Sequence, residues 1–111
     1  MARTKILSDK KKQLGQFMTP ESLSKDLVSK INFNKTDKVL EPSFGKGSFI
    51  INLIEKFLPL YSGTIQDKLD YILNYNIWGY EIDEELYDIC LDEIYQKWGY
   101  IPKQHNLFCL D

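Results

Sequence analysis

The sequence predicts an α/β fold built on a parallel sheet. Three short apolar runs, at residues 38–41, 77–81 and 104–109, alternate with longer segments whose apolar residues recur at helical spacing. Such a strand–helix–strand alternation is typical of parallel sheets with right-handed crossovers. We therefore expect parallel strands in the order 3-2-1, with the 38–41 strand at one edge, an N-terminal helix, and helices on both faces of the sheet.

The first expected helix runs over residues 20–31. Thr19 is a typical N-cap residue, and Pro20 then occupies the first helical position, where its missing N–H costs nothing. Leu23, Leu27 and Ile31 recur every four residues, which indicates one apolar face directed at a core.

Three further helices are expected between the strands. One begins at residue 48 and keeps helical spacing as far as Pro59, and a short one, over 67–73, is an insertion in the same connection. Asp83 is placed to cap the last helix, and Gly99 to end it.

Length and composition favour one cytoplasmic domain. The chain has 111 residues, of which 43% are apolar and 27% charged, as in ordinary globular proteins. No apolar run approaches the roughly 18 residues of a membrane span, and no signal peptide is evident. Cys90, Cys109 and the single histidine provide no plausible metal set, so both thiols are expected to be reduced and buried.

Charge argues against this chain gripping DNA by itself. The net charge is −2, whereas proteins that bind duplex DNA usually present a basic face. The exception is residues 1–14, which we expect to be a basic flexible arm; contact with phosphates is the alternative interpretation of this segment.

The stretch V-L-E-P-S-F-G-K-G-S-F, residues 39–49, predicts a strand, a tight turn and a helix. A phosphate-binding P-loop would need glycine at position 40, which is Leu40, and a dinucleotide fingerprint would need a third glycine at position 50, which is Ile50. What remains is an acid, Glu41, followed by Gly45 and Gly47. An acid at the carboxyl end of a strand lies where ligands bind in open α/β sheets.

Two more polar residues are expected at the same edge. Glu81 ends the second strand, where an acid typically accepts hydrogen bonds from ribose hydroxyls. Asp83 fits better as an acid at the start of a helix. Asn106 belongs to the third strand, and we expect it to face the same ligand.

These motifs resemble a known family. Gly-Gln-Phe-Met-Thr-Pro at 15–20 resembles motif X of the gamma arrangement of adenine-N6 DNA methyltransferases, in which motif X precedes motif I. Residues 40–49 look like motif I, 77–83 like motif II and 105–108 like motif III. The nearest resemblance is to restriction–modification methylases of the TaqI and Eco57I type. It implies that residues 15–111 are the first half of a Rossmann-like domain that binds S-adenosylmethionine (SAM).

The resemblance also implies a role for each motif in binding SAM. Motif X closes over the methionine carboxylate, and motif I shapes the pocket for the amino-acid moiety. Glu81 accepts the ribose hydroxyls, Ile82 packs on the adenine, and Asn106 stands where the family usually has an aspartate for the adenine amino group. The implied cofactor-binding residues are Phe17, Thr19, Pro20, Glu41, Pro42, Ser43, Gly45, Gly47, Glu81, Ile82, Asn106 and Leu107.

The family's catalytic motif, Asn/Asp-Pro-Pro-Tyr/Phe, is absent, because all four prolines are isolated. We therefore assign no catalytic residue and expect the chain alone to be inactive. Double-stranded DNA would be bound through a missing C-terminal part. The open sheet edge would favour self-association or pairing with a second chain. A non-catalytic fragment of a split methyltransferase, and a methyltransferase segment acting on RNA or protein, remain as alternatives.

Overall fold

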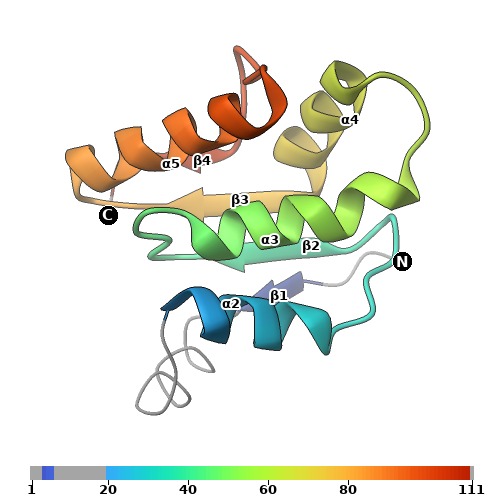
Figure 1. The fold of residues 1–111 in the computed structure, drawn as a ribbon, viewed down its shortest axis with the longest axis horizontal. Coiled ribbons are helices and arrows are strands. Elements are labelled where there is room, and N and C mark those ends of the chain that lie inside the picture. The colour runs from blue at the N-terminus through green and yellow to red at the C-terminus, as the bar shows by residue number, and fades with distance from the viewer. Residues whose placement is uncertain (1–3, 7–19, 111) are drawn as a thin grey trace.

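The structure of the chain, a computed structural model, describes residues 4–6 and 20–110. Four strands form one parallel sheet in the order β1-β2-β3-β4 (Figure 1). They are β1 (Thr4–Ile6), β2 (Lys38–Glu41), β3 (Ile77–Tyr80) and β4 (Leu107–Phe108). The parallel α/β class expected from the sequence is confirmed.

The register of the sheet fixes which strand ends meet. Val39 pairs with Ile77 and Glu41 with Gly79 across β2 and β3, and Gly79 pairs in turn with Leu107 of β4. The strand that carries Glu81 at its end therefore lies between the other two expected strands. Because all the pairings are parallel, the turns that follow β2 and β3 lie together at the carboxyl edge of the sheet.

The expectation that β2 forms an open edge is wrong. β1 pairs with β2 through Thr4 and Lys38, and through Ile6 and Leu40. An edge strand leaves a row of unpaired backbone N–H and C=O groups, and three residues from the start of the chain satisfy that row here. The basic arm predicted for residues 1–14 thus contributes residues 4–6 to the sheet, and its other residues lie outside those that the structure describes.

The helices connect the strands in chain order. α2 (Pro20–Ser29) precedes β2, and α3 (Ser48–Phe57) with the 3-10 turn η1 (Leu58–Leu60) follows it. α4 (Ile65–Tyr71) continues into a π-helical turn, η2 (Ile72–Asn76), that leads directly into β3, and α5 (Glu84–Trp98) joins β3 to β4. In the described residues, no helix combines the length and the apolar character needed to cross a membrane.

The described helices cover one face of the sheet, which corrects the expectation of helices on both faces. Figure 1 shows α2, α3 and α5 on the same side of the strands. Side chains that alternate along β2 and β3 differ accordingly: Val39 and Ile77 are fully buried, whereas Leu40, Trp78 and Tyr80 are only partly buried. Each successive strand is added in the same direction, so right-handed crossovers place every connecting helix on the same face.

The core lies between that covered face and the helices. The largest contribution comes from α3, whose apolar residues follow the expected helical spacing. The fully buried apolar side chains are Val39, Ile50, Leu53, Ile54, Phe57, Leu69, Ile72, Leu73, Ile77, Cys90 and Ile94.

Replacing Leu53, which is 0% exposed, by alanine should lower the free energy of unfolding by about 2–5 kcal/mol, because it leaves a cavity beneath the sheet. Leu60→Ala, at a side chain that is 37% exposed, should cost much less and serves as the control. Urea unfolding followed by far-UV circular dichroism measures both. Equal midpoints for the two variants would show that Leu53 is not a core residue.

Candidate ligand-binding site at the carboxyl edge of the sheet

The carboxyl ends of β2 and β3 are joined by a hydrogen-bonded clamp centred on Glu81. Its Oε1 accepts a hydrogen bond from the Gly45 N–H at 2.8 Å, and its Oε2 accepts one from the Asp83 N–H at 2.8 Å. The Phe44 N–H donates to the Tyr80 carbonyl oxygen at 3.2 Å. One carboxylate, 5% exposed, therefore fixes the 42–47 turn against the end of β3.

Both glycines of the turn have left-handed backbone conformations, but the space around them differs. Gly45 has φ of 57°, and a Cβ there would meet no atom within 4 Å. Gly47 has φ of 96°, and a Cβ there would lie 2.3 Å from Cys90 Sγ on α5. Gly47 thus allows the turn to pack closely on α5, whereas Gly45 borders open space next to Glu81.

Glu41 ends β2 as expected but is 0% exposed. Its Oε1 accepts a hydrogen bond from the Ser43 N–H at 3.1 Å, which holds the start of the turn. Pro42 and Ser43 are both exposed. The side chains of the turn that are exposed are therefore those of Pro42, Ser43 and Lys46, and Glu41 supports the turn from below.

Asp83 is the N-cap of α5, as the sequence predicts. Its Oδ1 accepts a hydrogen bond from the Leu86 N–H at 3.1 Å, which satisfies one of the unpaired donors of the first turn. Between this cap and Glu81 lies Ile82, which is 69% exposed. An apolar side chain this exposed beside a clamped carboxylate is available for contact with a ligand.

The expectation that Asn106 lies at this edge is wrong. β4 begins only at Leu107, so Asn106 precedes the strand and lies toward the opposite end of the sheet. Its N–H donates to the Leu73 carbonyl at 2.7 Å, and its carbonyl accepts from the Gly79 N–H at 2.9 Å. Leu107 is 1% exposed and belongs to the core.

The residue that follows β4 at the carboxyl edge is Cys109, which was expected to be a buried thiol. It is exposed, and its Sγ lies 3.9 Å from the Ile82 carbonyl oxygen. The apolar pair Leu107-Phe108 was the signal that could have placed the strand end here. Partial desolvation and the nearby carboxylates, Glu84 and Asp88 among them, raise the pKa of the Cys109 thiol.

Motif X is only partly described. Phe17 and Thr19 lie outside the described residues, so the predicted cap of the first helix is not observed. Pro20 is the first residue of α2, as expected. Within the part of the chain that the structure describes, no group of three or more His, Cys, Asp or Glu side chains is arranged to hold a metal ion.

The fold is a parallel α/β fold with the buried acids Glu41 and Glu81 at its carboxyl edge, and comparison with known proteins places the chain in a family. A family model described as N-6 DNA Methylase matches residues 4–95. The chain belongs to the N-6 DNA methylase family, which confirms the family resemblance drawn from the motifs.

Individual relatives agree with this. The chain is similar to the type II methyltransferase M.HincII of Haemophilus influenzae, with 44% identity over 46 residues, which is 41% of this chain and 9% of the relative. It is also similar to the type II restriction enzyme and methyltransferase RM.BcgI of Heyndrickxia coagulans, with 30% identity over 76 residues, 68% of this chain and 12% of the relative. It thus spans about a tenth of the length of these curated relatives.

A solved structure shows the same fold. It is a modification subunit of a proposed type I restriction enzyme from Vibrio vulnificus YJ016, which superposes with a TM-score of 0.59 at 18% identity. The superposition covers 95% of this chain and 21% of the other.

Gly47→Ala should destabilise the chain more than Gly45→Ala. A left-handed backbone costs a residue with a Cβ about 1–2 kcal/mol at either position. At position 47 the new Cβ also overlaps Cys90, which adds about 1–3 kcal/mol of overpacking. Thermal unfolding of the two variants tests this. An equal loss at both positions would show that the Cys90 contact does not limit residue 47.

Proposed function

We propose that the carboxyl edge binds SAM, and that the chain is the cofactor-binding N-terminal portion of a Rossmann-like methyltransferase that methylates adenine N6 in DNA within a restriction–modification system. The single observation that carries the proposal is the Glu81 clamp. It joins the motif I turn to the end of motif II in a chain that belongs to the N-6 DNA methylase family.

The adenosine half of SAM fits the residues around Glu81. A carboxylate has about four acceptor positions, and the Gly45 and Asp83 amides take one on each oxygen. The remaining positions can accept the two ribose hydroxyls, with the carboxylate already oriented. Ile82, exposed beside it, is suited to pack on the adenine ring. No role toward the adenine is proposed for Asn106 or Leu107.

The amino-acid half of SAM is assigned to the turn and to motif X. The space over Gly45 admits a ligand close to the backbone, with Pro42 and Ser43 at the exposed surface and Glu41 holding the turn. Phe17, Thr19 and Pro20 would close over the methionine carboxylate, as the motif X resemblance implies. SAM, when bound, supplies a methyl group activated on a positive sulfur, and the acids near this edge favour a cationic ligand.

Methyl transfer to adenine would require a further part of the protein besides residues 1–111. The chain lacks the Asn/Asp-Pro-Pro-Tyr/Phe motif and spans 21% of the structural relative. Within the described residues, the sheet face that carries Leu40, Trp78 and Tyr80 has no helix on it. We propose that a downstream part covers this face, supplies the adenine pocket and binds double-stranded DNA. The enzyme would work in the cytoplasm, where the free thiols stay reduced.

The role of Glu81 is tested by an isosteric change. Glu81→Gln keeps the size of the side chain but removes the charge, and it sets an NH2 group against one of the two backbone N–H donors of the clamp. Hydrogen bonds to charged groups contribute about 1.5–3 kcal/mol. SAM affinity, measured by calorimetric titration, should fall roughly 10-fold or more. Asp83→Asn, a change of the same chemistry at the helix cap, should leave SAM affinity nearly unaltered. Equal affinities for the two folded variants would reject the ribose assignment.

Methyl transfer tests the larger proposal. Residues 1–111 alone should transfer no labelled methyl group from SAM to mixed-sequence duplex DNA, because they lack the Asn/Asp-Pro-Pro-Tyr/Phe motif that would hold an extruded adenine at the SAM edge. Adding the downstream part as a separate chain should restore transfer. Activity from residues 1–111 alone would show that the catalytic groups lie elsewhere. SAM binding without restored transfer would favour the non-catalytic alternative.

A further inference from the structure

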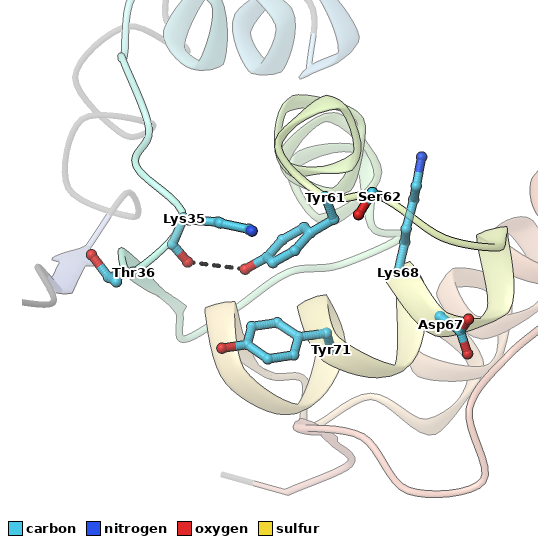
Figure 2. A pocket seen from close by; sticks show the side chains of 7 residues that line it. All are labelled: Lys35, Thr36, Tyr61, Ser62, Asp67, Lys68 and Tyr71. Atoms are coloured by element: carbon cyan, nitrogen blue, oxygen red, sulfur yellow. Dashed lines mark hydrogen bonds between the residues drawn. The ribbon is translucent and has the colours of Figure 1, made fainter.

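A pocket lies at the opposite end of the sheet from the Glu41 and Glu81 edge. It has a volume of about 360 Å³ and lies beside the segment that enters β2, where η1 meets α4. Sites for small ligands typically occupy about 300–1,000 Å³, so this pocket is large enough for one small ligand. Its lining residues are Lys35, Thr36, Tyr61, Ser62, Asp67, Lys68 and Tyr71 (Figure 2).

One wall of the pocket is held rigidly. The Tyr61 hydroxyl lies 2.6 Å from Asn76 Oδ1 and 2.9 Å from the Lys35 carbonyl oxygen, and its proton is donated to these acceptors. Asn76 is 0% exposed, and its Nδ2 donates to the carbonyls of Lys35 and Asp37 at 2.9 and 2.8 Å. Burial raises the pKa of Tyr61 to about 12, so the hydroxyl stays neutral.

The other wall is an exposed aromatic ring. Tyr71 is 48% exposed, and its ring centroid lies 4.9 Å from that of Tyr61, at an interplanar angle of 49°. The Tyr71 ring centroid also lies 5.2 Å from that of Tyr75, at an interplanar angle of 50°. The rings are tilted rather than stacked, and Tyr71 is about half exposed, so part of its ring is accessible for stacking on a ligand.

Two lysines flank these rings. Lys35 Nζ lies 5.1 Å from the centroid of the Tyr61 ring, and Figure 2 shows Lys68 on the other side of the pocket. Lys38 is held in the same manner over Tyr75, at 5.0 Å. Because an ammonium group already occupies the face of Tyr61, the pocket is unsuited to a cationic ligand. With two lysines against Asp67, its lining carries a net positive charge.

We propose that this pocket binds a nucleobase carrying a phosphate, with the base stacked on Tyr71 and the phosphate between Lys35 and Lys68. Aromatic platforms beside cationic side chains are the recurring chemistry of base and backbone recognition in unpaired nucleic acid. The same chemistry is offered by a free nucleotide and by a nucleotide within a single strand. The site is separate from the SAM edge, and its existence does not depend on the function proposed above.

Binding is tested on the whole chain with thymidine compounds, because an adenine nucleotide could enter the SAM edge instead. The probes are thymidine 5′-monophosphate, inorganic phosphate, and a labelled single strand of oligothymidylate, alone and annealed into a duplex. Binding of the monophosphate alone identifies a free nucleotide, and tighter binding of the single strand identifies unpaired nucleic acid. Saturating SAM should displace neither. Displacement by SAM, inorganic phosphate binding as tightly as the monophosphate, or no binding at all would overturn the proposal.

Variants separate stacking from charge. Tyr71→Ala should weaken binding roughly 5- to 150-fold, the effect of losing one stacked base. Tyr95→Ala on α5, at a ring that is 51% exposed, is the matched control and should change nothing. Lys35→Gln and Lys68→Gln should each reduce the salt dependence of strand binding, by about 0.7 in the log–log slope per lost phosphate contact, whereas Lys103→Gln should not. Unchanged affinity for folded Tyr71→Ala would exclude this site.

Discussion

The arrangement of the carboxyl edge depends on the Glu81 carboxylate. The backbone N–H groups of Gly45 and Asp83 donate to its two oxygens. Gly45 is 36 residues from Glu81 in the chain, and Asp83 is 2 residues from it. Charge-assisted hydrogen bonds to a carboxylate are among the stronger ones in proteins. These hydrogen bonds offset the cost of burying the carboxylate, which fixes the turn after β2 and the entry to α5 at the same time.

The same clamp explains how an almost buried acid can still be placed to bind a ligand. At 5% exposure Glu81 looks structural, yet its remaining acceptor positions are preorganised by the two amides that it already holds. Preorganised groups lose little freedom when a ligand binds. Structural support and ligand recognition are therefore compatible roles for one carboxylate, and the exposed Ile82 next to it shows on which side a ligand would approach.

Much of this fold could be predicted from local sequence, for identifiable reasons. Asp83 and Gly99 mark the ends of α5 because capping chemistry is local, and the periodic apolar residues of α3 predict its buried face. β1 was missed because three residues in a lysine-rich segment carry too little pattern, and only a neighbouring strand reveals them. The position of Asn106 was predicted wrongly because the register of the two-residue strand β4 is set by its pairing with β3, where Leu107 pairs with Gly79. The side chains of β4 itself carry too little pattern to fix that register.

The close contact between Gly47 and Cys90 makes the buried thiol a reporter of the turn. Burial raises the pKa of Cys90 to about 12, so very little thiolate is present at neutral pH, and the turn covers the sulfur. A thiol reagent should modify the exposed Cys109 first and reach Cys90 only when the turn and α5 separate. The rate of the second modification would then measure how often this edge of the sheet opens.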